Sequence, residues 1–141
     1  MKLFDLFTKK SLPSHLQTGI FGERKAAAYL RKKGYRILER NFSSHGKEID
    51  IIAENRNSLV FCEVKTRRTN EALMEKYGRP SDAVNYYKQK NVISGAKIYL
   101  SYNKTDKNVR FDVIEVYLKE SKKKHPRVLE IKQIENAFRN K

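Results

Sequence analysis

The sequence predicts an α/β protein in which a mixed β-sheet is flanked by helices. Two observations predict this fold. Segments with the apolar spacing of helices are mixed with segments rich in β-branched residues, and one long segment is apolar on both faces, as in a central strand. A chain of 141 residues with 39% apolar residues suits one domain with a buried core. We expect a flexible leader at residues 1–13 and a single domain at residues 14–141.

Two segments have the pattern of helices. The first begins at Ser14, whose side chain can form a capping box with Gln17, and it ends before Gly34, a residue that tolerates a left-handed backbone. The second begins at Pro80, a favoured first residue of a helix, and continues to about Ser101.

The other regular segments are predicted strands, at 35–42, 48–53, 59–65, 108–118 and, at one edge of the sheet, 128–134. A polar loop is expected at 43–47, after the first strand. Turn residues around Arg56 and Asn57 join the second and third strands into a hairpin. The resulting order is α-β-β-β-α-β, followed by the edge strand.

The charge of the chain favours a polyanionic partner. Lysine and arginine number 31 against 16 acidic residues, so the net charge is +15. The basic residues are spread along the chain, so the body of the domain and not a tail is basic. Such a domain attracts nucleic acid or an anionic membrane surface.

Several other classes of protein are disfavoured by the composition. One cysteine and three isolated histidines offer neither an intrachain disulfide nor the ligand spacing of a zinc site. No apolar run is long enough to span a bilayer, and the first residues do not form a secretory signal. We therefore expect a cytoplasmic protein whose partner is nucleic acid and not a membrane.

The predicted hairpin brings two carboxylates together. With a two-residue turn at Arg56 and Asn57, Asp50 lies directly opposite Glu63. Carboxylates that close repel each other, and a divalent cation bound between them would remove the conflict. Oxygen ligands of this kind suit Mg²⁺ or Mn²⁺. Lys65 shares a strand face with Glu63, where an ammonium would stabilise charge on a phosphate or position a water. In the alternative interpretation, Glu63 and Lys65 are a surface pair that aids solubility, and a turn one residue longer would shift Asp50 out of register.

These residues resemble a known nuclease core. Asp50, followed on the next strand by Glu63-Val64-Lys65, resembles the PD-(D/E)xK core of restriction-endonuclease-like enzymes and Holliday-junction resolvases. Over residues 19–138 the chain also resembles the YraN family of small bacterial proteins. The stretches that carry this resemblance are Gly22-Glu23, Tyr29-Leu30, Gly34-Tyr35, Asn41, Glu48 to Ile52, Phe61 to Lys65, Arg67, Ala83-Val84, Lys88, Arg110 to Val113 and Asn136 to Phe138. The chain departs from the motif at Ile49, where the nuclease core has proline, and at Lys47, where the family usually has glycine.

The resemblance implies a restriction-endonuclease-like fold and a nuclease-like domain. It implies metal-binding roles for Asp50 and Glu63, a catalytic role for Lys65, and a contribution to the active site from Glu23 in the first helix. The implied activity is a Mg²⁺- or Mn²⁺-dependent endonuclease that hydrolyses DNA phosphodiester bonds, with branched DNA among the substrates to test. A homodimer is implied because two symmetric cuts suit two active sites.

Further basic and polar residues are candidate contacts to nucleic acid, namely Arg67, Arg68, Lys88 and Gln89. For each of them the alternative is an ordinary solvated surface. Glu48 shares a predicted strand face with Asp50 and either supports the site or forms a surface ion pair. For the whole protein, the alternative to an endonuclease is a non-catalytic nucleic-acid-binding module that retains the nuclease fold. A cleavage assay separates these two functions.

Overall fold

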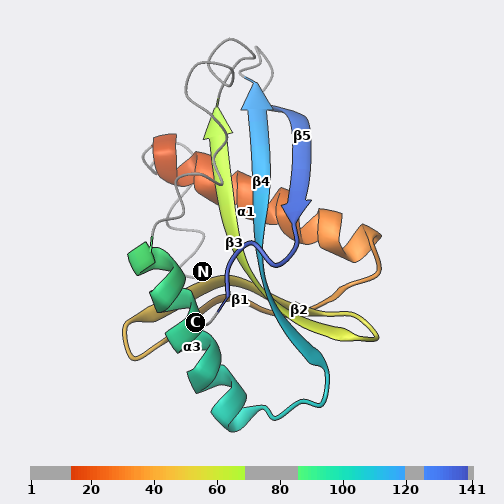
Figure 1. Cartoon of the computed structure of the whole chain (residues 1–141). Coiled ribbons are helices and arrows are strands. Elements are labelled where there is room, and N and C mark those ends of the chain that lie inside the picture. The colour runs from red at the N-terminus through yellow and green to blue at the C-terminus, as the bar shows by residue number, and fades with distance from the viewer. Residues whose placement is uncertain (1–13, 69–85, 120–125, 140–141) are drawn as a thin grey trace, which may run out of the picture.

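The computed structural model describes residues 14–68, 86–119 and 126–139, which form a mixed α/β fold (Figure 1). The elements in chain order are α1 (Ser14–Lys32), β1 (Arg36–Ser44), β2 (Lys47–Glu54), β3 (Ser58–Arg68), α3 (Tyr86–Tyr102), β4 (Asn108–Lys119) and β5 (Arg127–Ile134). This order confirms the predicted α-β-β-β-α-β arrangement and the additional edge strand. The predicted leader at 1–13 and the predicted start of the second helix at Pro80 lie outside the described residues.

The sheet has five strands in the order β1-β2-β3-β4-β5. The pairs β1–β2, β2–β3 and β4–β5 are antiparallel, whereas β3 and β4 are parallel, so the sheet is mixed as predicted. β4 pairs with β3 from Ser58 to Arg68, but the ladder between β2 and β3 covers only Leu59 to Cys62 of β3. Among the described residues, the second half of β3 therefore has no strand partner on the side of β2.

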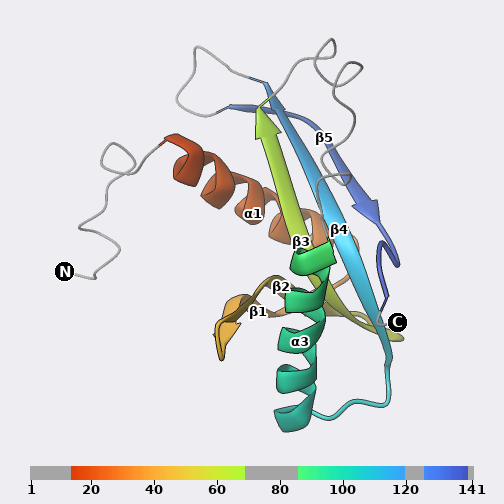
Figure 2. The ribbon, with the colours of Figure 1, turned by 60° about the vertical axis from the view of Figure 1, so that its left-hand side comes forward.

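Each helix covers one face of the sheet (Figure 2). α1 packs mainly against β3 and contributes Leu30 to a core cluster with Ile51 and Val60. α3 packs mainly against β2 and contributes Val92 to a second cluster, which includes Phe61. Burial of these apolar side chains on both faces explains why the middle strands are apolar throughout. None of the helices in the described ranges combines the length and apolarity that crossing a membrane requires.

The ends of the first helix and the first strand are set by left-handed residues. α1 ends at Lys32 and Gly34 follows with a φ of 95°, which confirms its predicted role. The loop predicted at 43–47 is wrong in extent, because His45 and Gly46 alone form the turn, with φ of 53° and 74°. Two successive positive φ values match the twist of a tight hairpin, and this lets β1 and β2 extend up to the turn.

A buried polar network surrounds Asp112 in the first half of β4. The carboxylate of Asp112 is fully buried, and Arg110 Nε lies 3.0 Å from its Oδ1. Gln133 Nε2 and the backbone N–H of Asn136 donate to the same carboxylate, at 2.8 and 3.1 Å. The network thus joins β4 to β5 and to the segment that follows β5.

Candidate active site

The hairpin of β2 and β3 has the predicted register. The backbone N–H of Asn55 donates to the carbonyl of Ser58 at 3.0 Å, which closes a turn with Arg56 and Asn57 at its tip. The side chain of Asn55 accepts further hydrogen bonds from the N–H groups of Asn57 and Ser58. This Asx-type turn fixes the register, and the ladder runs from Glu54–Leu59 to Ile51–Cys62.

Asp50 lies one position beyond the end of that ladder. The prediction placed it directly opposite Glu63, but the backbone pairing stops at Ile51 and Cys62. The N–H of Val64 instead donates to Oδ2 of Asp50 at 2.8 Å. The carboxylate thus takes the place of a backbone carbonyl, because the two strands separate here.

The regular alternation of side chains along β2 is interrupted at Asp50. Ile49 packs in the cluster under α3, whereas Ile51 packs in the cluster under α1. In a regular strand residues 49 and 51 would point to the same face. Asp50 is therefore at the bend of β2, where groups from both faces of the sheet can act on it.

Glu63 is the most deeply buried of the candidate site residues, with 3% of its surface exposed. Its Oε1 lies 3.4 Å from Nζ of Lys88 and 3.9 Å from Nζ of Lys65. Its Oε2 is buried and has no hydrogen-bond partner among the described residues. Burial, and after it the negative charge of Asp50, raises the pKa of Glu63 to about 7.

Burial likewise raises the pKa of Asp50, although the N–H of Val64 and then the charge of Lys88 act in the opposite direction. Two neighbouring carboxylates thus resist ionisation because they are poorly solvated and close to each other. Such a pair is stabilised by a cation, and its oxygen donors are those that Mg²⁺ and Mn²⁺ prefer. Oε2 of Glu63, which has no hydrogen-bond partner in the described part of the chain, would be available as a ligand atom.

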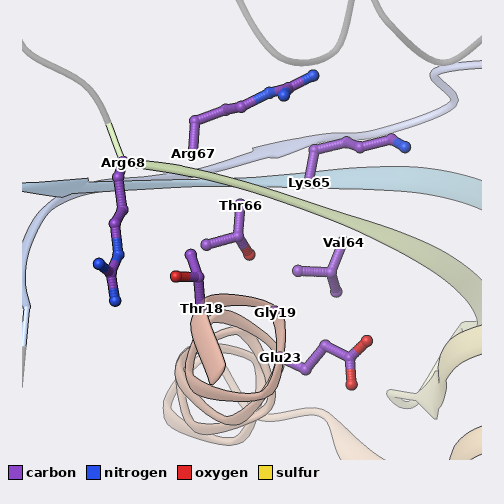
Figure 3. Close-up of a pocket in the computed structure, with 8 residues that line it drawn as sticks. All are labelled: Thr18, Gly19, Glu23, Val64, Lys65, Thr66, Arg67 and Arg68. Carbon is purple, nitrogen blue, oxygen red and sulfur yellow. The ribbon is translucent and has the colours of Figure 1, made fainter. Parts of the chain in front are cut away.

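Glu23 approaches the site from α1. The helix lies unusually close to β3 at Gly22, where an added Cβ would be 1.9 Å from Oγ1 of Thr66. Glu23 and the end of β3 line an open groove of about 680 Å³ (Figure 3). Burial, followed by the charge of Asp50, raises the pKa of Glu23 to about 7. Within the described ranges, no three acidic, histidine or cysteine side chains lie close enough to hold a metal ion, and Glu23 is a neighbour whose pKa responds to the charge of Asp50.

The basic residues of β3 are divided between its two sides. Lys65 and Arg67 point away from α1, whereas Arg68 points toward it, beside Thr66 (Figure 3). The contact of Lys65 with Glu63 confirms that these two share a face. Arg67 and Arg68 are both exposed and point to opposite sides of β3, although both line the groove beside α1.

The start of α3 adds a second basic segment. Lys88 contacts Glu63, and Gln89 beside it is half-buried. Tyr86 and Tyr87 are 61% and 77% exposed, so both rings lie largely in solvent. Glu48 is exposed, and its charge acts on Lys88, which favours its interpretation as a neighbouring surface charge.

Lys88 is the residue whose position sequence reasoning missed. It was expected to contact nucleic acid, but its ammonium is closer to Glu63 than that of Lys65, the lysine of the motif. No short-range pattern reveals this contact, because Glu63 and Lys88 are 25 positions apart in the chain.

Comparison with known proteins places these residues in a family. The model of the family described as "Uncharacterised protein family UPF0102" matches residues 22–116. The chain belongs to the UPF0102 family. The resemblance to the YraN family is thereby confirmed, since the two names denote one family. The matched part of this UPF0102 chain contains every candidate site residue, from Glu23 to Gln89.

Other UPF0102 proteins are similar over most of the chain. The UPF0102 protein of Caldanaerobacter subterraneus subsp. tengcongensis is 47% identical over 105 residues, which cover 74% of this chain and 82% of that protein. Those of Alkaliphilus oremlandii and Clostridium acetobutylicum are 46% and 42% identical over 123 residues. These alignments cover 85% and 86% of this chain, and 96% and 93% of the relatives.

Proposed function

We propose that this protein is a divalent-metal-dependent endonuclease that hydrolyses phosphodiester bonds of DNA. One observation carries the proposal: Asp50 and the buried Glu63 form a poorly solvated acid pair flanked by the ammonium groups of Lys65 and Lys88. An acid pair needs a cation, and the lysines supply positive charge for an anion beside it. A phosphodiester that binds a metal ion brings both kinds of group together.

Asp50 and Glu63 are the residues that would hold Mg²⁺ or Mn²⁺. A metal ion bound there would polarise a phosphoryl oxygen and activate a water. Lys65, on the same face as Glu63, would stabilise the negative charge that develops on the phosphate. Glu23, whose pKa responds to the charge of Asp50, would accept a hydrogen bond from a water near that carboxylate.

The surroundings of the acid pair favour a nucleic acid as the substrate. Arg67 extends the basic side of β3, and Arg68 lies in the groove next to α1, so phosphates on either side of the strand have a cationic contact. The exposed rings of Tyr86 and Tyr87 adjoin Lys88, and aromatic side chains of this kind can stack on unpaired bases. The net charge of +15 would attract the polyanion over a longer range.

The resemblance to PD-(D/E)xK nucleases supports the same activity. In those enzymes the acidic residues and the lysine of the motif lie on neighbouring strands, and here β2 carries Asp50 while β3 carries Glu63 and Lys65. The order of helices and strands also agrees with that core.

The proposal is tested with labelled single-stranded, duplex and branched DNA, each incubated with Mg²⁺, Mn²⁺ or EDTA. We expect cleavage with metal only, and a loss of about 100-fold or more in rate in Asp50→Asn and Glu63→Gln. Asp106→Asn is the matched control, because it removes the same charge from an exposed position after α3 and should cleave like the wild type.

Two results would contradict the proposal. Cleavage that persists in Asp50→Asn would come from a contaminating nuclease. Salt-sensitive binding of DNA without cleavage under either metal would instead assign the protein to the non-catalytic binding modules.

A further inference from the structure

The ammonium of Lys88 lies closer to Glu63 than does that of Lys65, the lysine of the motif. Nζ of Lys88 lies 3.4 Å from Oε1 of Glu63, and its side chain is 36% exposed, whereas that of Glu63 is almost fully buried. The ammonium therefore stands at the solvent side of the carboxylate. The long side chain of lysine allows this charge to move without a change in the helix.

The ammonium of Lys88 interacts electrostatically with more than one carboxylate. Burial acts to lower the pKa of Lys88, but the charges of Glu63 and then Asp50 outweigh burial and raise that pKa above its usual range. Lys88 in turn opposes the increase in the pKa of both acids. In the metal-free protein, one lysine thus compensates part of the repulsion within the pair.

A divalent cation would compete with this lysine. The cation would need Glu63 as a ligand, and Oε1 of Glu63 is the atom that the ammonium contacts. Two positive groups next to the same carboxylate repel each other, so the ammonium would be displaced outward when the metal binds. Lys88 is the more exposed of the two side chains, so a displaced ammonium would move to the side from which the phosphate of a substrate would approach.

We propose that Lys88 is an internal counter-cation that occupies Glu63 in the metal-free protein and contacts a phosphate oxygen of the substrate once a divalent metal has displaced it. This inference rests on the proposed function, since it assumes the same metal and substrate. Lys88 would thus have two successive partners, first Glu63 and then a phosphate oxygen. Lys65 would keep a single role, the stabilisation of negative charge on the phosphate.

The test measures Mn²⁺ binding by calorimetry without DNA, and cleavage in a separate assay. Lys88→Met should bind Mn²⁺ about 3- to 10-fold more tightly than the wild type, because the competing charge is gone. The same variant should cleave saturating DNA about 10-fold or more slowly, because a phosphate contact is lost. Lys88→Arg keeps the charge and should return Mn²⁺ affinity toward that of the wild type.

Lys90→Met is the matched control for helix α3. The ammonium of Lys90 lies 4.7 Å from the ring centre of Tyr86, so its removal should leave Mn²⁺ affinity unchanged. Equal or weaker Mn²⁺ binding by Lys88→Met, while the wild type binds Mn²⁺ and cleaves DNA, would overturn this inference alone. A wild-type protein that binds no Mn²⁺ would overturn the proposed function as well.

Discussion

Asp50 shows how one side chain can end a strand pair and build a site. Its carboxylate accepts the N–H of Val64, a group that a backbone carbonyl would have satisfied if the ladder had continued. The buried N–H keeps a hydrogen bond, so the strands can separate without the cost of an unpaired donor. The carboxylate of Glu63 lies close enough to that of Asp50 for the charge of Asp50 to raise its pKa.

The raised pKa of Glu23 predicts that the stability of the protein depends measurably on pH. The pKa of about 7 lies above the ordinary value of 4.5 for a glutamate, so the folded protein binds this proton more tightly than the unfolded chain does. The contribution of Glu23 to stability is therefore lost as the pH rises from about 4.5 to 7.

In EDTA at pH 8, Glu23→Gln should be more stable than the wild type by about 1 kcal/mol, a value reduced for the partial exposure of Glu23. The difference should vanish near pH 3, well below both pKa values, where the wild-type carboxyl is protonated in both states. Urea unfolding at the two pH values measures it, with Glu39→Gln, an exposed glutamate of β1, as the control. A difference that is the same at both pH values would contradict the interpretation.

Removal of the Asp112 carboxylate is expected to reduce the stability of the fold strongly, although this residue is not one of the candidate site residues. Its carboxylate is fully buried and is held by Arg110, Gln133 and the N–H of Asn136. Asp112→Ala leaves these donors without their acceptor and should lower the free energy of unfolding by about 3–5 kcal/mol. Chemical denaturation measures the loss, and a variant as stable as the wild type would show that the network contributes little.

At the scale of elements, the contact between α1 and β3 decides where Glu23 lies. Gly22 allows the helix to approach Thr66 so closely that a side chain would not fit. A glycine inside a helix normally costs up to about 1 kcal/mol relative to alanine, so its presence here is explained by the packing that it permits. Glu23, the next residue, is brought toward the acid pair by the same contact.

Substitution of this glycine tests the role of the close contact. Gly22→Ala should push α1 away from β3 and destabilise the protein by about 1–3 kcal/mol. Gly19→Ala is the matched control on the same helix, because nothing lies within 4 Å of its added Cβ. That control should be neutral or more stable by up to about 1 kcal/mol. Thermal unfolding compares the two, and equal stability of both variants would show that the helix can yield without cost.

At the scale of the whole molecule, the positive charge and the acid pair have separate effects. The net charge of +15 acts over about a Debye length on any polyanion, whereas the acid pair acts only at one point of the surface. Binding and cleavage should therefore respond to different changes.

The salt dependence of DNA binding isolates the first effect. In EDTA, the logarithm of the affinity should fall linearly with the logarithm of the salt concentration, by about 0.9 per phosphate contact in duplex DNA. Arg67→Ala should reduce this slope by about one unit. Arg56→Ala, at the opposite end of β3 in an exposed turn, should leave it unchanged, as fluorescence anisotropy can show. Equal slopes for the two variants would remove Arg67 from the interface.

The sequence by itself was sufficient for the order of elements and for the register of the β2–β3 hairpin. Both depend on short-range rules, because a turn and a period of two residues determine which positions of a hairpin face each other. The placement of Glu63 and Lys65 on one face follows from the same rules, and the ion pair between them confirms it.

Only the tertiary structure decided how the strands separate at Asp50 and which side chains reach the acid pair from the helices. Lys88 and Glu23 lie far from Glu63 in the chain, and their approach depends on how α3 and α1 pack on the sheet. That packing follows from side-chain shape, as at Gly22, and from the satisfaction of buried polar groups, as at Val64. Such contacts join distant segments, so no local pattern of residue types encodes them.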